Sequence, residues 1–161
     1  MKVIIFEPEK CSGCRTCELV CSVKHTNYAD PMRSLIRILK KEEYVFIPIR
    51  CRQCEEPWCE VVCPVGAISK DEELGTVTVD YDKCRGCRLC TEICPFGGAQ
   101  WKFKDRRVMM CDLCEGDPTC VKCCPTGALQ YVEEDEIPPA KREKLFAIYA
   151  GLMDIYRGVV R

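Results

Sequence analysis

Short apolar runs alternate with cysteine-rich segments along most of the chain. Runs that are rich in β-branched and aromatic residues and bounded by Gly, Asp or Glu are typical of strands in hairpins. Three runs lead toward a cysteine group and three leave one: 3–6, 76–81 and 106–110 lead in, and 67–69, 99–103 and 128–132 lead out. The pattern therefore predicts two short hairpins between cysteine groups, with turns near 73–75 and 104–105.

The remaining intervals predict a third hairpin and several helical turns. The interval 22–50 contains the apolar segments RSLIRIL and YVFIPIR on either side of the charged stretch KKEE, which indicates a hairpin insert. Within each cysteine group, three residues such as ELV or EVV separate the last two cysteines, and they suit one short helical turn.

The segment after Pro138 and Pro139 has helical periodicity. Its apolar residues recur at helical spacing: Leu145, Tyr149, Leu152, Tyr156 and Val159, joined by Phe146, Met153 and Val160. This spacing predicts an amphipathic helix of about 20 residues and about 30 Å. We favour packing of its apolar face on the rest of the chain, with docking to another subunit or a second copy as the alternatives. The acidic run 133–136 before it is expected to be a solvated linker.

Composition and charge exclude several classes of protein. The 161 residues have a formal net charge of −1, so the chain has no basic field for nucleic acid. No run approaches the roughly 18 apolar residues of a membrane span, and the N-terminus lacks the features of a secretory signal. We therefore expect a cytoplasmic protein, in which the 17 cysteines are metal ligands rather than disulfide partners.

The cysteines fall into four groups with repeated spacing. Groups one and three, CSGCRTCELVC at 11–21 and CRGCRLCTEICP at 84–95, have the C-x2-C-x2-C-x3-C run of bacterial two-cluster ferredoxins. Groups two and four, CRQCEEPWCEVVCP at 51–64 and CDLCEGDPTCVKCCP at 111–125, lengthen only the middle interval. Three of the groups end in Cys-Pro and continue alike, as CPVGAI, CPFGGAQ and CPTGAL.

This spacing suits [4Fe–4S] clusters. Three closely set thiolates reach three iron corners, and in two-cluster ferredoxins the fourth ligand comes from the other group. Four groups thus imply two pairs and four clusters. Structural zinc, the competing metal, uses two C-x2-C knuckles or cysteine with histidine, and His25 is the only histidine in the sequence. Of the adjacent Cys123 and Cys124, the x3 interval and the following Pro125 favour Cys124 as ligand, and we expect Cys123 to be a small buried apolar residue.

With these motifs, residues 1–132 resemble the four-cluster iron–sulfur subunits of molybdenum and tungsten bis-pterin oxidoreductases, such as the dimethyl sulfoxide reductase beta subunits. The opening EPEKCSGCRTCELVCSVKH and the short length are more similar still to the small subunits paired with tungsten aldehyde oxidoreductases, benzoyl-CoA reductases and carbon monoxide dehydrogenase. The resemblance implies an α+β, tandem (double) bacterial ferredoxin-like fold over 1–132 with the hairpin insert 22–50, followed by a linker and C-terminal helix at 133–161.

The resemblance also implies that groups one and four share clusters, and that groups two and three do the same. We number each site by the group that supplies three of its cysteines. Carried onto this chain, the ligand sets are Cys11, Cys14, Cys17 and Cys124 for site 1; Cys51, Cys54, Cys59 and Cys94 for site 2; Cys84, Cys87, Cys90 and Cys63 for site 3; and Cys111, Cys114, Cys120 and Cys21 for site 4. Some relatives hold a three-iron cluster where Trp replaces a cysteine of the third group. Here Cys87 fills that position, so four [4Fe–4S] clusters are expected.

The sequence predicts electron transfer rather than catalysis, because it contains no Ser-His-Asp set, P-loop or G-x-G-x-x-G motif. We expect a non-catalytic subunit that relays electrons between a tungsten- or molybdenum-pterin enzyme of anaerobic metabolism, an aldehyde oxidoreductase above all, and a flavin subunit, hydrogenase or ferredoxin. The alternatives are a free polyferredoxin, a subunit of carbon monoxide dehydrogenase or hydrogenase, and a structural zinc module. Self-association into chains is a further hypothesis.

Two sets of residues near the motifs have a functional and a plain interpretation. The basic residues inside the groups either raise cluster potentials or, as we favour, form a solvated surface that balances cluster charge: Arg15, Arg50, Arg52, Lys83, Arg85, Arg88 and Lys122. Trp58 and Trp101 are expected to pack in the core rather than to relay electrons.

Overall fold

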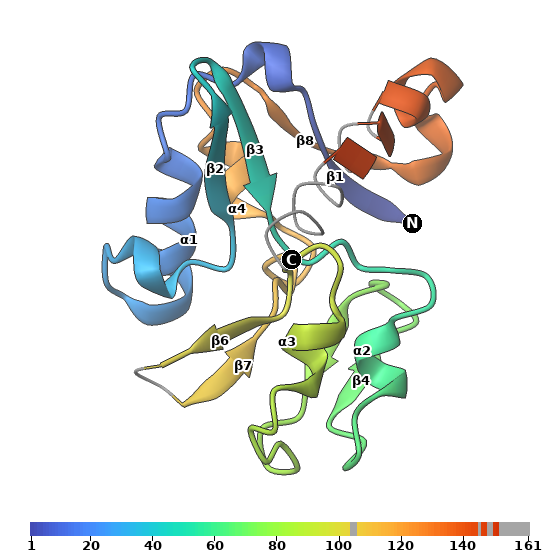
Figure 1. Cartoon of the computed structure of the whole chain (residues 1–161). Helices are drawn as coiled ribbons and strands as arrows, with labels where there is room; N and C mark the ends of the chain where they lie inside the picture. The colour runs from blue at the N-terminus through green and yellow to red at the C-terminus, as the bar shows by residue number, and fades with distance from the viewer. Residues whose placement is uncertain (104–105, 145, 148–149, 152–161) are drawn as a thin grey trace.

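The computed structural model describes residues 1–103, 106–144, 146–147 and 150–151. In this part of the chain, short strands pair into two-stranded antiparallel sheets, β1 with β8, β2 with β3, β4 with β5, and β6 with β7 (Figure 1). The strands are β1 (Lys2–Phe6), β2 (Arg37–Glu42), β3 (Val45–Ile49), β4 (Ile68–Lys70), β5 (Val77–Val79), β6 (Gln100–Lys102), β7 (Arg107–Met109) and β8 (Leu129–Glu133). The predicted α+β class with short hairpins is confirmed.

A helix lies between the third and fourth cysteine of every group, as predicted. These helices are α1 (Thr16–Thr26), α2 (Trp58–Val61), α3 (Leu89–Ile93) and α4 (Thr119–Lys122), and 3-10 turns occur at η1 (Pro8–Lys10), η2 (Pro31–Arg33) and η3 (Glu134–Glu136). Because α1 continues beyond its cysteines, it enters the interval assigned to the hairpin insert. The buried Glu18 of α1 accepts a hydrogen bond from the Ile38 N–H at 2.6 Å, which ties the insert to this helix.

Strands β1 and β8 join the two ends of the cysteine-rich part of the chain. Their register runs from Lys2 opposite Glu133 to Phe6 opposite Leu129. Alternate residues of β1 face opposite sides, as a strand requires. Ile4 and Phe6 pack in the main core, whereas Ile5 packs with Ile137 in a second, smaller cluster.

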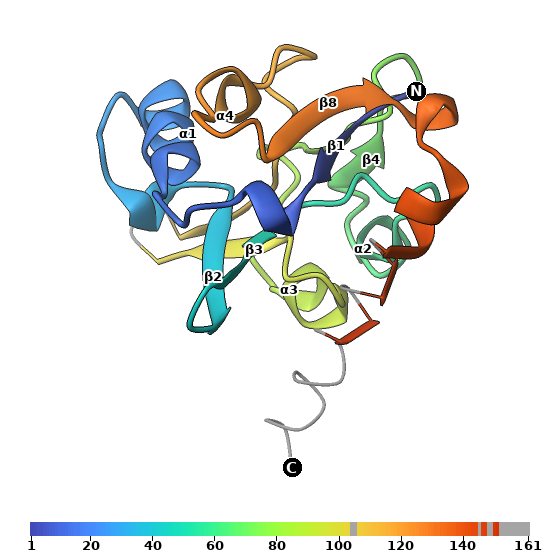
Figure 2. The same cartoon turned by 90° about the horizontal axis from the view of Figure 1, so that it is seen from above.

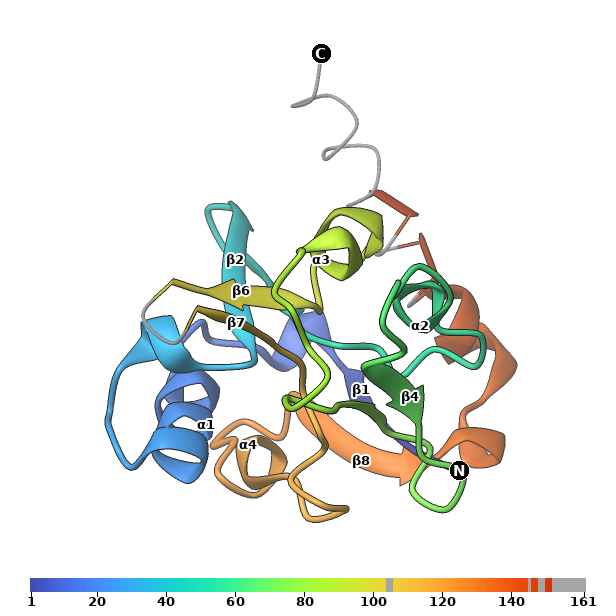
Figure 3. The same ribbon diagram turned by 90° about the horizontal axis from the view of Figure 1, so that it is seen from below.

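The four helices form two pairs that lie on different sides of the molecule. Helix α1 packs against α4, and α2 packs against α3. Figures 2 and 3 show these two pairs on different sides of the molecule, with β1 between them. The main core includes fully buried apolar side chains from several of the connecting segments, among them Ile36, Val77, Val108 and Leu113.

The C-terminal segment is helical at 139–144, 146–147 and 150–151. Its first turn rests on η1, because Lys141 pairs with Glu7 and Lys144 with Glu9. Phe146 is 76% exposed. Most of the predicted apolar face lies outside the described residues: Leu145, Tyr149, Leu152, Met153, Tyr156, Val159 and Val160. The predicted turn at 104–105 also lies outside them.

Two details differ from the sequence prediction. Strand β2 continues through Glu42, so the turn of this hairpin comes at Glu43 and Tyr44 rather than across KKEE. Trp58 is 67% exposed, so the expectation that it packs in the core is wrong. No helix among the described residues is long and apolar enough to cross a bilayer.

Candidate iron–sulfur centre

Each cysteine group begins with a tight loop that has the same backbone bend. The residue before the second cysteine has a left-handed φ in every group: 69° at Gly13, 54° at Gln53, 68° at Gly86 and 55° at Leu113. Glycine adopts this conformation without a Cβ penalty, whereas Gln and Leu do not. Gln53 and Leu113 are both buried, so packing holds the loops of groups two and four in the geometry that glycine gives groups one and three.

The Cys-Pro-x-Gly segments form a second repeated turn. At each of them the glycine N–H donates to the carbonyl oxygen of the fourth cysteine at 3.2 Å, for the pairs Gly66 with Cys63, Gly97 with Cys94, and Gly127 with Cys124. The next N–H then reaches sulfur: Ala67 donates to the Cys63 Sγ at 3.2 Å and Gly98 to the Cys94 Sγ at 3.3 Å. N–H groups directed at sulfur stabilise its charged form.

Group one lacks the Cys-Pro turn, and the hairpin insert supplies the N–H donor to its fourth cysteine instead. The Leu35 N–H donates to the Cys21 Sγ at 3.3 Å. Leu35 is buried just before β2, so the hairpin insert supplies a donor that the other groups take from their own following turn.

The structure brings the sulfur atoms together in four sets. Site 1 is visible as a small cavity whose lining includes Cys11, Cys14, Cys17 and Cys124 together with Phe6 and Leu129. At site 2, Cys51 interacts electrostatically with Cys54, Cys59 and Cys94. At site 3, Cys90 interacts with Cys87, Cys84 and Cys63. At site 4, Cys120 interacts with Cys111, Cys21 and Cys114.

The electrostatics of these sets fit a bound cationic core. Burial, and after it the neighbouring sulfurs, raises the pKa of Cys51 and Cys59 to about 11, and burial with the neighbouring Glu18 raises the pKa of Cys17 to about 12. Crowded thiols of this kind lose their protons when a metal binds, because the metal charge compensates the thiolates. The residues present therefore fit [4Fe–4S] clusters, which the four sulfurs of each set would hold.

Two side chains that are not cysteine ligands, His25 and Arg50, lie close to cysteines of site 4. The ring of the half-buried His25 places Nε2 at 3.8 Å from the Cys114 Sγ and 3.6 Å from the Asp112 Oδ1. Cys114 first, and then Cys21, raises the pKa of His25 to about 10. The ring of His25 thus lies close to both a sulfur of site 4 and the Asp112 carboxylate.

Arg50 is the second of these side chains. It is 4% exposed, and its guanidinium donates to the carbonyl oxygens of Ile4 and Cys51. Its charge also acts on Cys111 and Cys120, where it opposes the effect of burial on the thiol pKa. The favoured interpretation of Arg50 as a solvated surface charge is therefore wrong, although it suits Arg15, Arg85, Arg88, Lys83 and Lys122, which are exposed.

Sites 2 and 4 are neighbours across the middle of the molecule. Cys51 of site 2 interacts electrostatically with Cys111 of site 4. Gln53 lies between their loops, and its Nε2 donates to the Cys111 carbonyl oxygen. Cys51 and Cys111 are buried, whereas Cys14 of site 1 and Cys87 of site 3 are exposed. Sites 1 and 3 are therefore accessible from solvent through one cysteine each, with sites 4 and 2 between them.

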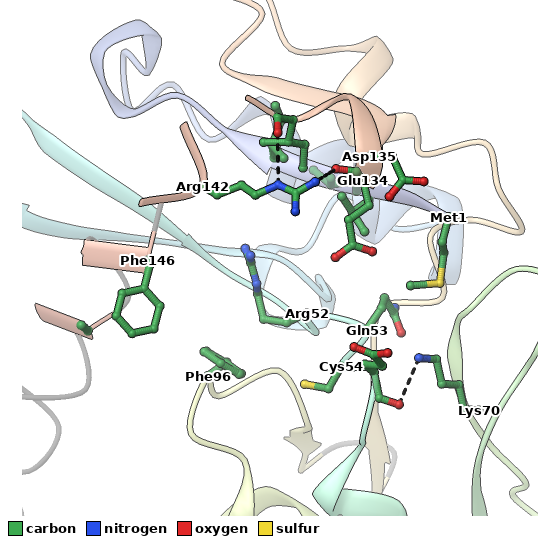
Figure 4. Close-up of a pocket in the computed structure, with 16 residues that line it drawn as sticks. Met1, Arg52, Gln53, Cys54, Lys70, Phe96, Glu134, Asp135, Arg142 and Phe146 are labelled. Carbon is green, nitrogen blue, oxygen red and sulfur yellow. Dashed lines mark hydrogen bonds between the residues drawn. The ribbon is translucent and has the colours of Figure 1, made fainter. Parts of the chain in front are cut away.

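A cavity of about 830 Å³ opens beside site 2. Its lining includes Arg52, Cys54 and Phe96 from groups two and three, with Ile5 from β1 and Phe146 from the C-terminal segment. Figure 4 shows Phe146 and Met1 toward opposite ends of the cavity, with Arg52 and Cys54 between them. Site 2 is thus accessible through Cys54 from this cavity, on the side of the C-terminal segment.

The seventeenth cysteine behaves differently from the prediction. Cys123 is exposed, so the expectation that it is buried is wrong. It follows the last residue of α4, whereas Cys120 and Cys124, one helical turn apart, both contribute to the main core.

Comparison with known proteins agrees with this geometry. A family model described as a 4Fe–4S dicluster domain matches residues 42–134, and a 4Fe–4S binding domain matches residues 8–24. The chain belongs to the 4Fe–4S dicluster domain family. This membership confirms the iron–sulfur resemblance on which the sequence prediction rests.

Two relatives of this dicluster protein are named as a polyferredoxin-like subunit and as a putative electron transport protein. It is 39% identical over 110 residues to the polyferredoxin-like subunit of an aliphatic sulfonate oxidoreductase from Pyrococcus furiosus, covering 68% of this chain and 64% of that one. It is 38% identical over 121 residues to the putative electron transport protein YsaA of Escherichia coli, covering 70% and 75%. The chain thus spans less than two thirds of the sulfonate oxidoreductase subunit.

A solved structure supports the fold. A chain of the active site complex BamBC of benzoyl-coenzyme A reductase, in complex with benzoyl-CoA, has a TM-score of 0.50 and 25% identity, covering 99% of this chain and 96% of that one. The predicted ferredoxin-like class is confirmed, and the prediction of a non-catalytic electron-transfer chain agrees with what the relatives are named.

Proposed function

We propose that this dicluster protein is the electron-transfer subunit of an oxidoreductase complex and relays electrons through four [4Fe–4S] clusters. The sixteen cysteines of sites 1 to 4 hold the clusters, as the sequence prediction assigns them. A bound cluster supplies one-electron oxidation and reduction. The observation that carries the proposal is the convergence of sixteen sulfurs in four sets, each completed by a cysteine from a distant group.

The protein's own residues make site 4 suitable for holding charge away from water. Cys21, Cys111 and Cys120 are buried, and the charge of the buried Arg50 acts on Cys111 and Cys120. A positive charge near a thiolate-bound centre stabilises its more reduced state, so Arg50 and His25 are expected to raise the potential of site 4. The exposed Cys14 and Cys87 give electrons an entrance and an exit at sites 1 and 3.

The proposed catalytic partner is a tungsten- or molybdenum-pterin enzyme of anaerobic metabolism in the cytoplasm, an aldehyde oxidoreductase above all. The second partner is a flavin subunit, a hydrogenase or a ferredoxin. Support for a catalytic partner comes from relatives that are named as subunits of larger oxidoreductases, including the sulfonate oxidoreductase subunit and the benzoyl-CoA reductase chain. Copurification from the native cell tests the assignment, because a chain that elutes alone and without pterin would favour a free polyferredoxin.

Iron analysis of two adjacent cysteine variants tests the ligand sets. Anaerobically prepared wild type should contain about sixteen irons and sixteen sulfides per chain. Cys124→Ala should lose about four irons because it removes a site 1 ligand, whereas the control Cys123→Ala, one residue away, should lose none. Equal iron loss in both variants would contradict the site 1 assignment, and a zinc-loaded wild type would reject the function altogether.

A further inference from the structure

The loop of group three and the β6–β7 hairpin form a basic surface around site 3. Its members are all exposed, and we call them the arginine surface: Lys83, Arg85, Arg88, Arg106 and Arg107. The hairpin abuts the loop closely, because a Cβ at Gly86 would lie 3.2 Å from the Trp101 ring and 3.7 Å from the Arg106 carbonyl oxygen. Figures 1 and 3 show this hairpin beside α3. The exposed Cys87 of site 3 belongs to the same loop.

Aromatic rings hold two of these arginines in place. The Arg88 guanidinium lies 4.1 Å from the centre of the Trp101 ring, and the Arg107 guanidinium lies 4.7 Å from that of Tyr81. Stacking on a ring orients a guanidinium and leaves its N–H edge free to bind carboxylates. The two arginines are therefore preorganised for acidic groups that come from outside the chain.

The opposite end of the molecule has a different charge arrangement. Near site 1, Lys10 pairs with Glu7 at 2.5 Å, and Lys141 and Lys144 pair with Glu7 and Glu9. On the arginine surface, Lys83 pairs with Asp80 at 3.1 Å, and within the described part of the chain the four arginines have no carboxylate partner. Among the described residues, four arginines without a carboxylate partner thus lie around site 3, although the whole chain has a formal charge of −1.

We propose that the arginine surface docks an acidic electron-carrier protein, which exchanges electrons with site 3 past Cys87. This inference rests on the proposed function and names the end of the cluster row at which the mobile carrier binds. Exposed apolar side chains in the same region, Leu89, Ile93 and Phe103, supply the apolar contacts that a protein interface needs. Complementary charge accelerates encounter, as an exchange with a mobile carrier requires.

A kinetic experiment with two charge-matched variants tests the docking. The probe is a purified acidic two-cluster ferredoxin, reduced photochemically and mixed with the cluster-loaded full chain in an anaerobic stopped-flow instrument. For wild type, the second-order rate should fall at least about tenfold between about 20 mM and about 500 mM NaCl. Arg85→Glu should lower the low-salt rate about tenfold, whereas Arg15→Glu at site 1 should change it less than about twofold. Both arginines are exposed, and each lies next to a cysteine of its group.

Two further measurements separate docking from other roles of the surface. Titration calorimetry should show a weaker complex of ferredoxin with Arg85→Glu than with Arg15→Glu. Equal effects of the two variants, or a rate that does not depend on salt, would overturn the proposal. So would a slower rate of Arg85→Glu at unchanged affinity with a shifted site 3 potential, or tighter binding of duplex DNA than of ferredoxin. Reduction by methyl viologen radical is the control for intact clusters. A wild type that viologen does not reduce rejects the proposed function itself, whereas failure of docking alone leaves viologen reduction intact.

Discussion

Gln53 is the residue that links the loops of sites 2 and 4, and replacing it with leucine tests that link. Its side chain is 4% exposed. Its amide nitrogen donates to the Cys111 carbonyl oxygen, and its amide oxygen accepts the Val77 N–H at 2.7 Å. One side chain thus joins the loop of group two, the loop of group four and strand β5.

The expected cost of Gln53→Leu follows from the two groups that it leaves without this side-chain partner. Each buried backbone group that loses its partner costs about 1–3 kcal/mol, so the variant should be destabilised by about 2–6 kcal/mol. Leucine is close in volume to glutamine and keeps the same left-handed backbone penalty, so packing and strain change little. Against a total stability of about 5–15 kcal/mol, the loss is a large fraction.

The assay is guanidinium unfolding of the cluster-loaded protein under anaerobic conditions, followed by the visible absorbance of the clusters. Gln130→Leu is the matched control, because the Gln130 amide makes only two long contacts, donating to the Gly127 carbonyl oxygen and accepting from the Lys141 Nζ, both at 3.4 Å. The control should stay within about 0.5 kcal/mol of wild type. A Gln53→Leu midpoint that coincides with the control would refute the role of Gln53 as a buried link.

Two other perturbations have clear expected outcomes. Gly98→Ala should prevent assembly of site 2, because the new Cβ would lie 2.5 Å from the Cys51 Cα, and iron analysis should show a loss of about four irons. Gly66→Ala is the control. No atom lies within 4 Å of its new Cβ, so the variant should only be destabilised by about 1 kcal/mol through its left-handed backbone. Glu7→Gln should lower the hydrogen-exchange protection of 139–144 by about 0.5–1 kcal/mol. Lys10 and then Lys141 lower the pKa of Glu7 from 4.5 to about 2. The difference in protection between wild type and Glu7→Gln should therefore be constant above pH 4.5 and shrink as the pH falls toward 2. A difference that grows on acidification would contradict the ion pairs.

The cysteine spacing allowed much of the local structure to be predicted. The cluster loops, the helical turns and the short strands beside the cysteine groups lie where the repeats and the apolar runs placed them, because each repeat is a local unit with its own turn chemistry. The glycine positions show this most clearly. Gly13 and Gly86 mark the left-handed bend directly, and the same bend at Gln53 and Leu113 becomes recognisable once the four groups are aligned on their cysteines.

The interactions between repeats could not be predicted in this way. Arg50 and Gln53 look like polar residues in exposed loops, yet both are buried, Arg50 against β1 and Gln53 against β5 and the loop of group four. Trp58 looks like a core residue, yet it begins the single-turn helix α2 and is exposed. His25 stands well apart in sequence from Cys114, and the contact exists because α1 packs against α4.

The exchange of cysteines between distant groups has a consequence for biosynthesis. The first site begins at Cys11 but is completed by Cys124, and β1 finds its partner only when β8 has been made. A ribosome must therefore release nearly the whole cysteine-rich region before the earliest set of sulfurs can close around iron. Iron insertion into the proposed site 1 therefore waits until Cys124 has been synthesised, and a chain that stops before Cys124 leaves the start of the protein as unfinished as its end.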